Sequence, residues 1–193
     1  PVKNGRGPRV LVLTPTRELA VQVTDAVDKY CKFMRHMRTG TILGGMPYPK
    51  QRRLLEQSLD VLVATPGRLI DFIDQGKVDF SRLELLILDE ADRMLDMGFI
   101  EPVKRIAAKT PGSRQTMLFS ATLDGNIAKL GRELLRDPKL IEVAAPKAKH
   151  ENIEQRLHDV DDGSHKHRLL DHVLRSDECQ AQSIVFTATK HGA

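Results

Sequence analysis

The chain has 193 residues, of which 40% are hydrophobic and 29% are charged, with 13 Gly and 10 Pro scattered along it. This balance is typical of a soluble globular chain of one to two domains, and it excludes disordered and collagen-like proteins. The formal net charge of +4 permits a polyanionic partner without requiring one. The longest apolar runs are far shorter than the roughly 20 residues of a membrane-spanning helix, so we expect no membrane association.

The remaining compositional signals are weak. The chain begins with Pro1 and lacks the apolar core of a signal peptide, so we interpret its start as a cut end. Cys31 and Cys179 lie far apart without a C-x-x-C pair, which favours reduced thiols and a cytoplasmic protein. His165, His167 and His172 lack the partners of a metal site, so we expect them to be solvated.

Short, continuous runs rich in Val, Ile and Leu predict five strands that are buried on both faces. They are Val10–Leu13, Thr41–Leu43, Val61–Ala64, Leu85–Leu88 and Met117–Phe119. Helical patterns lie between them, and one has its apolar stripe at Leu19, Val23, Val27 and Tyr30. The alternation predicts an α/β fold, with a parallel sheet and helices on both faces. A further strand is predicted at Leu140–Val143, after a helix that ends near Leu135.

The last quarter of the chain has a different pattern. Residues 144–152 show no apolar periodicity and are predicted to form a linker between a first lobe, 1–143, and a second, 153–193. The second part contains a predicted strand at Ile153–Val160, a helix at His167–Arg175 and a strand at Ser183–Phe186. Because about 40 residues cannot bury a core of their own, we expect only the beginning of a second α/β lobe.

Each of the five strands predicted in the first lobe is followed by a loop that is polar or contains Gly or Pro. The loops are Thr14–Glu18, Gly44–Gly45, Thr65–Arg68, Asp89–Asp92 and Ser120–Thr122. Strands of an open parallel sheet point the same way, so the loops after their carboxyl ends share one edge, where such folds bind ligands. We therefore expect these five loops to form one surface.

The strand that ends in Asp89 and Glu90 looks like a Walker B element, which holds hydrated magnesium beside nucleotide phosphates. Asp89 can anchor the ion through its water shell, and Glu90 would orient and polarise the attacking water. The alternative is that both acids only stabilise a helix N-terminus. Ser120 and Thr122 have a similar ambiguity, because small hydroxyl residues often cap helices, yet here they can also hydrogen-bond to Asp92.

The other three loops carry groups that suit a phosphodiester backbone. The amides are those of Gly44, Gly45 and Gly67, the hydroxyls those of Thr16 and Thr65, and the guanidinium groups those of Arg17 and Arg68. The helix N-termini after Pro15 and Pro66 point N–H groups at anions. The alternatives are helix capping by the threonines and an intrahelical ion pair for Arg17. Only 4% of residues are aromatic, which favours backbone contacts over base stacking.

Together these motifs resemble the DEAD-box family of superfamily 2 RNA helicases. Residues 89–92 spell the family name, and Pro15–Leu19, Gly44–Gly45, Thr65–Arg68 and Ser120–Thr122 follow in the family's order and at similar spacing. Ile184–Thr187 looks like the first motif of the family's second RecA-like lobe. The amino-acid sequences of the loops resemble those of the bacterial RhlE-like branch. The resemblance implies RecA-like lobes, ATP and Mg²⁺ as cofactors, and local unwinding of short RNA duplexes.

The resemblance also implies site residues. Asp89 and Glu90 would serve magnesium and the attacking water, while Asp92, Ser120 and Thr122 would couple hydrolysis to strand separation. Single-stranded RNA would be held by its backbone, largely without regard to sequence, at Pro15, Thr16, Arg17, Glu18, Gly44, Gly45, Thr65, Pro66, Gly67 and Arg68. The motifs indicate no particular protein partner.

The sequence departs from the family in one important respect. It contains no G-x-x-x-x-G-K-[ST] phosphate loop, since Gly76-Lys77 is followed by Val78. The strand for that loop, the adenine-reading segment and the arginine finger are also missing, so we expect a fragment that is inactive alone. Two alternatives for the parent protein stay open: a non-catalytic RNA-binding or chaperone module, whose mark would be loss of Asp89 or Glu90, and a superfamily 2 DNA helicase.

Overall fold

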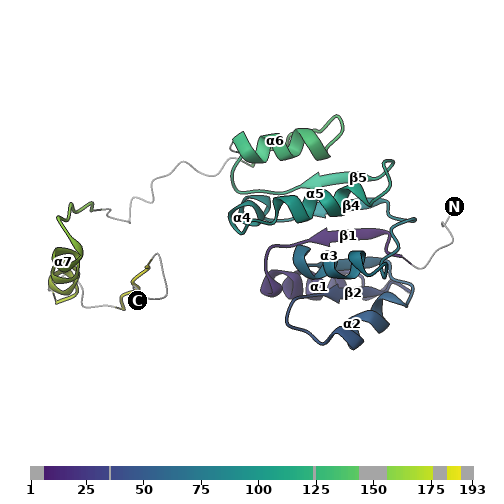
Figure 1. Ribbon diagram of the computed structural model, residues 1–193, viewed down its shortest axis with the longest axis horizontal. Coiled ribbons are helices and arrows are strands. Elements are labelled where there is room, and N and C mark those ends of the chain that lie inside the picture. Colours follow the sequence, from purple (N-terminus) through teal and green to yellow (C-terminus); the bar gives the residue numbers. More distant parts are fainter. Residues whose placement is uncertain (1–6, 35, 124, 144–155, 176–181, 188–193) are drawn as a thin grey trace. The chain divides into compact units, whose positions relative to one another are not determined.

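The computed structural model describes residues 7–34, 36–123, 125–143, 156–175 and 182–187. Contacts divide the chain into two units, Pro1–Leu140 and Ile141–Ala193. The first unit is a five-stranded parallel sheet with helices packed on both faces (Figure 1). The predicted α/β class is therefore confirmed for this unit.

The sheet has the strand order β2-β3-β1-β4-β5, and every neighbouring pair is parallel. Its strands are β1 (Val10–Leu13), β2 (Thr39–Ile42), β3 (Val61–Ala64), β4 (Leu85–Leu88) and β5 (Gln115–Leu118). Three strands have the predicted bounds, whereas β2 and β5 begin earlier, at polar or small residues. The reason is that ladder hydrogen bonds come from the backbone, so a strand can start before its apolar run does.

Among the described residues of the first unit, six helices connect or follow the strands. They are α1 (Arg17–Tyr30), α2 (Tyr48–Leu55), α3 (Pro66–Asp74), α4 (Ala91–Asp96), α5 (Ile100–Ala108) and α6 (Gly125–Leu134). Helix α1 packs on one face of the sheet through Ala20, Val23 and Val27. Helices α3 and α5 pack against each other and cover the opposite face (Figure 1). Tyr30, predicted to continue the apolar stripe of α1, is instead 80% exposed, because it lies at the last residue of the helix.

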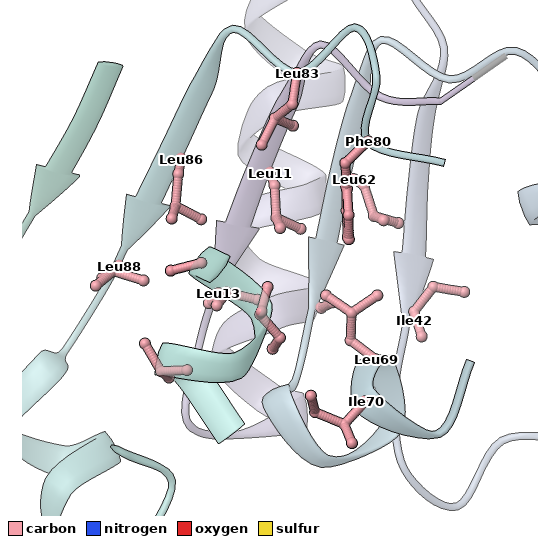
Figure 2. Close-up of a cluster of buried hydrophobic side chains, with 14 of the residues drawn as sticks. Leu11, Leu13, Ile42, Leu62, Leu69, Ile70, Phe80, Leu83, Leu86 and Leu88 are labelled. Carbon is pink, nitrogen blue, oxygen red and sulfur yellow. The ribbon is translucent and has the colours of Figure 1, made fainter. Parts of the chain in front are cut away.

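Alternate residues of the central strands enter two separate cores. Leu11 and Leu13 of β1 point toward α3 and α5, whereas Val12 between them packs on the α1 side. The period of two is that of an extended strand, and Figure 2 shows the larger core, in which Leu62, Leu86 and Leu88 line the same face of the sheet. Burial on both faces explains why these strands are apolar throughout.

Burial on both faces was predicted for all five strands, and for β5 this is wrong. Residues Gln115 and Met117 of this strand are exposed, and Phe119 just after it is 49% exposed. The cause is its position, since β5 is at the edge of the sheet and α1 lies across the opposite half, against β2 and β3. Only the side facing the larger core is partly covered, at Leu118.

The strand predicted at Leu140–Val143 is also absent. These residues form no strand, and Leu140, Ile141 and Val143 are 69 to 88% exposed. A β-strand needs a partner for its backbone N–H and C=O groups, and in the described part of the chain β5 pairs only with β4. The apolar run is therefore real, but its pairing partner does not lie among the described residues.

In the second unit the described residues form one helix, α7 (Gly163–Arg175), which begins four positions before the predicted His167. Neither 156–160 nor 182–187 forms a strand, and Phe186 is 91% exposed. No described residue of α7 is buried. Residues 144–152, Ile153 and Cys179 lie outside the described ranges, and the linker boundaries stay a prediction. None of the described helices is both long and apolar enough to cross a membrane.

The central strand β3 provides a test of this packing. Leu62 is fully buried between β1 and β2, so we expect Leu62→Ala to lower the free energy of unfolding by about 2–5 kcal/mol through lost burial and a residual cavity. Urea unfolding of the full-length protein measures this difference. Leu140→Ala is the control, because Leu140 is exposed and its truncation should change stability by less than about 0.5 kcal/mol. Equal effects of the two substitutions would contradict the assigned core.

Candidate functional site

The loops that carry the predicted site residues lie along one edge of the sheet. All five strands run in the same direction, and their order places the loop after β2 first, followed by those after β3, β1, β4 and β5. Hydrogen bonds link neighbouring loops just beyond the strands, from Thr14 N–H to Ala64 O and from Asp89 N–H to Leu13 O. The structure thus brings the predicted loops together as one surface.

Helices α1 and α3 begin at this edge, each close to a Thr-Pro pair, and each has a threonine as its N-cap residue. Thr16 is the N-cap of α1, and its hydroxyl accepts a hydrogen bond from the Leu19 N–H at 3.3 Å. The capping alternative is therefore realised for Thr16. Thr65 occupies the same position before α3 but makes no side-chain cap bond. Its neighbour Gly67 is exposed with open space around it, so the backbone there is accessible to a ligand.

Both arginines of these loops bind carbonyl groups of the loop after β2. Arg17 Nη1 donates to Gly44 O at 3.2 Å, rather than forming an intrahelical ion pair. Arg68 Nη1 donates to Met46 O at 2.7 Å, and its guanidinium lies 4.0 Å from the centre of the Tyr48 ring. The Arg68 side chain is only 9% exposed. The Arg68 side chain therefore packs against the loop after β2 and supports it, while Arg17 remains exposed.

A cleft of about 420 Å³ lies among these loops, lined by Pro15, Thr16, Arg17, Glu18, Gly44, Gly45, Thr65, Met97 and Phe99. The sequence did not assign roles to Met97 and Phe99. Gly98 between them has a φ of 76° and ends α4 in a Schellman motif, with Phe99 N–H bonded to Met94 O and Gly98 N–H to Leu95 O. Gly98 was the feature of the sequence that could have indicated Met97 and Phe99, because it ends α4 and turns the chain back toward the cleft.

Asp89 lies directly after β4 and is half-buried. Its Oδ1 accepts a hydrogen bond from the Glu90 N–H at 3.0 Å. Burial raises the pKa of the Asp89 carboxyl above its ordinary value; the Glu90 hydrogen bond opposes this shift and the Glu90 charge adds to it. A desolvated carboxylate of this kind gains from a nearby cation.

Glu90 has a left-handed backbone, with φ 49° and ψ 55°, which a residue with a side chain rarely adopts. The following residue, Ala91, is buried and its N–H donates to Phe119 O at 3.0 Å, which fixes the turn between β4 and α4 against β5. The Glu90 carboxylate is 3.4 Å from Arg93 Nη1 in an exposed pair. A left-handed residue at this position is uncommon outside glycine and costs backbone free energy, about 1–3 kcal/mol.

Asp92 connects the acidic loop to the loop after β5. Its Oδ2 accepts from the Thr122 hydroxyl at 3.5 Å, the outer limit for a hydrogen bond. The Ser120 hydroxyl makes no hydrogen bond to Asp92 among the described residues; it accepts one from the Thr122 N–H at 3.4 Å. Ser120 is thus hydrogen-bonded to the backbone of Thr122, and the Thr122 side chain is hydrogen-bonded to Asp92.

The acidic loop fits an ion that keeps most of its water. Within the described residues, no three His, Cys, Asp or Glu side chains are grouped to hold a metal directly. Magnesium is usually bound by one or two carboxylates with water in its other positions, and Asp89 meets that requirement. Two histidines of α7 have local partners, Asp161 for His165 and the Gly163 carbonyl for His167.

Comparison with known proteins identifies the scaffold. The domain described as "DEAD/DEAH box helicase" matches residues 2–130. The chain belongs to this family. It is 42% identical over 187 residues to the ATP-dependent RNA helicase SrmB of Escherichia coli, covering 96% of this chain and 42% of the relative. It is 41% identical to the ATP-dependent RNA helicase RhlB of Pseudomonas syringae, covering 95% of this chain and 46% of the relative.

Solved structures of other DEAD/DEAH box helicases share the fold. An ATP-dependent RNA helicase from Sulfolobus tokodaii, described as hypothetical, has a TM-score of 0.64 and 40% identity over 69% of this chain and 40% of its own. The yeast DEAD-box splicing factor Prp28 has the same TM-score at 35% identity, over 67% of this chain and 31% of its own. The RecA-like assignment is thereby confirmed. The chain spans less than half the length of the two curated relatives named above.

Asp89 provides a test of the acidic loop without any ligand. Because its pKa is raised in the folded state, ionisation at neutral pH destabilises the fold, and Asp89→Asn should raise the unfolding temperature at pH 7. The gain should shrink as the pH falls and vanish below the ordinary pKa of an Asp carboxyl, about 3.9, where the carboxyl is protonated in both the folded and the unfolded state. Thermal unfolding across this pH range measures it. Asp96→Asn is the control, since Asp96 is exposed at the end of α4, and a lower stability of Asp89→Asn at pH 7 would contradict the interpretation.

Proposed function

We propose that the protein to which this chain belongs is an ATP-dependent RNA helicase that holds single-stranded RNA by its backbone and locally separates short duplexes. The observation that carries the proposal is the single edge of a parallel sheet, where an acidic loop and three anion-binding loops lie side by side. The named relatives SrmB and RhlB, which are called RNA helicases, support it.

In this proposal the loop after β4 serves the nucleotide. Asp89 would hold Mg²⁺ through the ion's water shell, and the ion would offset negative charge on the phosphates. Glu90, one residue further along an unusual turn, would accept a proton from and orient the water that attacks the terminal phosphate. Its pairing with Arg93 is weak and solvent-exposed, so the carboxylate stays accessible.

The contacts between the ends of β4 and β5 would transmit the state of the nucleotide. Asp92 reaches Thr122, and the backbone of Ala91 is bonded to Phe119. A displacement of the acidic loop on hydrolysis would therefore move the Ser120–Thr122 segment. This supports the role of Asp92, Ser120 and Thr122 in coupling hydrolysis to strand separation.

The cleft next to the acidic loop would hold RNA. It combines the N-termini of α1 and α3, the exposed Arg17 and the amides of the loop after β2. Such groups recognise phosphate and sugar without reading bases, so binding would be largely independent of sequence. Met97 and Phe99 add apolar surface to the same cleft, suited to the faces of riboses or bases.

Several observations favour this function over the alternatives. A non-catalytic module would have no need of both Asp89 and Glu90, and both are present. The relatives compared above are named as RNA rather than DNA helicases. Competition between single-stranded RNA and DNA for stimulating ATP hydrolysis by the full-length protein decides between the two polymers. A cytoplasmic location belongs to the same proposal and agrees with the free thiol of Cys31.

Glu90→Gln in the full-length protein tests the catalytic assignment. We expect RNA-stimulated phosphate release to fall by about 10²–10⁴-fold, because the amide cannot take up a proton, while RNA binding is retained. Glu101→Gln is the matched control, since Glu101 is an exposed residue of α5. The 193-residue chain alone, which lacks a phosphate-loop motif, should give no turnover. Undiminished phosphate release by Glu90→Gln would refute the proposed role.

Met97→Ala tests the apolar wall of the cleft. We expect the RNA concentration that gives half-maximal ATPase activity to rise about 3–10-fold, since roughly one buried methionine side chain's contact is lost. Titration of ATPase activity with a short single-stranded RNA measures this change. Met34→Ala is the control, because Met34 is similarly exposed but lies beyond the other end of α1. Identical titrations for the two variants would exclude Met97 from the RNA site.

A further inference from the structure

Gln51 is a buried polar residue to which the sequence assigned no role. It lies on α2, is 4% exposed, and directs its side-chain amide into the loop after β2. Its Oε1 accepts from the Leu43 N–H at 2.7 Å, and its Nε2 donates to Leu43 O and Met46 O, both at 3.1 Å. Leu43 is the first residue beyond β2, and the Gln51 side chain pairs with its N–H and C=O groups as a neighbouring strand would.

The carbonyl groups of this loop are held from three directions. Gln51 binds those of Leu43 and Met46, Arg17 binds that of Gly44, and Arg68 binds Met46 a second time. Of these three side chains only Gln51 is uncharged, and only Gln51 also binds a backbone N–H. Gln51 thus fixes Leu43 at the start of the turn and the Met46 carbonyl at its end.

The amides of the turn, which are the N–H groups of Gly44 and Gly45, have no hydrogen-bond acceptor among the described residues. Gly45 has a left-handed φ of 76°, and a side chain there would collide with the Arg17 guanidinium. A turn whose carbonyls are tied inward and whose N–H groups are free presents an anion-binding concavity. The two glycines line the cleft described above.

We propose that Gln51 is a positioning residue for RNA: by holding Leu43 and Met46, it keeps the Gly44 and Gly45 amides directed at the RNA backbone. The inference rests on the proposed function, because it takes the cleft as the RNA site. Gln51 itself is buried and does not line the cleft. Its effect is on the orientation of two backbone N–H groups, so its loss should weaken RNA binding without altering the nucleotide site.

The chemistry of the position is demanding. A methionine of similar length would leave the Leu43 N–H and the Leu43 carbonyl without their partner, while the Met46 carbonyl would keep Arg68. Unpaired buried groups drive local rearrangement. A glutamate would keep the acceptor for the Leu43 N–H but would face two carbonyl oxygens with a second oxygen. When protonated, however, the glutamic acid regains one donor and resembles the amide.

The test uses the full-length protein and direct binding of a fluorescently labelled oligouridine, followed by anisotropy. Gln51→Met should raise the Kd for this RNA about tenfold or more, comparable to losing one good backbone interaction. The KM for ATP and the kcat at saturating RNA should stay within about twofold of wild type. Gln57→Met is the matched control, because Gln57 is exposed just beyond the same helix.

Gln51→Glu adds a pH profile that a purely structural loss would not produce. Relative to wild type, its RNA affinity should be weak near pH 8 and recover as the pH falls toward about 6, because the buried carboxyl then takes up a proton. Protonation of the Gln51→Glu carboxyl thus restores RNA affinity without any further substitution. If Gln51→Met does not fold, this profile decides the question by itself.

The outcomes are distinct. An unchanged Kd for Gln51→Met, a pH-independent Gln51→Glu, or a loss of RNA affinity that is matched by equal damage to the KM for ATP would overturn the inference. Wild-type protein that binds RNA without hydrolysing ATP would refute the proposed function, while the Gln51 comparison would still stand. Wild-type protein that binds no oligouridine would refute both.

Discussion

Because every neighbouring pair of strands in this sheet is parallel, each strand ends at the same edge, and the chain must cross back before the next strand begins. Five loops from distant parts of the sequence are thereby placed in a row. The strand order puts the acidic loop after β4 between the loops after β1 and β5. Asp89 is consequently bonded to Leu13 on one side, while Ala91 is bonded to Phe119 on the other.

Side chains that appeared to be ligand groups in the sequence support the backbone in the structure. Thr16 caps a helix, and Arg68 packs beneath Tyr48 while binding Met46 O. In the proposed function, these internal contacts would orient the N–H groups of the loops toward RNA. Contacts from the protein backbone to the nucleic-acid backbone would not depend on base sequence.

The elements that were predicted correctly depend on local pattern. The runs at β1 and β3 are apolar throughout because α1 and the α3–α5 pair cover both faces, while on the α1 side Ile87 of β4 is only partly buried. The order of the motifs was likewise sufficient to indicate the family. Pairing and burial were harder: Leu140–Val143 is as apolar as a strand, yet strand formation depends on a partner that local sequence cannot reveal. β5 was correctly placed along the chain, but its exposure depends on its position in the sheet.

The site shows the same division. The acidic residues and the glycines were found from motif and spacing, whereas Met97 and Phe99 required knowledge of where a Schellman turn directs the chain after α4. Gln51 was missed because a single glutamine in an amphipathic helix carries no periodic signal. Its importance comes from a loop that lies beside it only after α2 has packed against β2.

In the described part of the chain, β5 forms one edge of the sheet, and this has a practical consequence for handling the chain on its own. Gln115–Leu118 pairs only with β4 among the described residues, and Met117 and Phe119 beside that edge are solvent-exposed. An open strand edge with apolar neighbours is a template for adding a strand from another molecule. Preparations of the isolated piece should therefore self-associate edge to edge and lose material to precipitation on concentration.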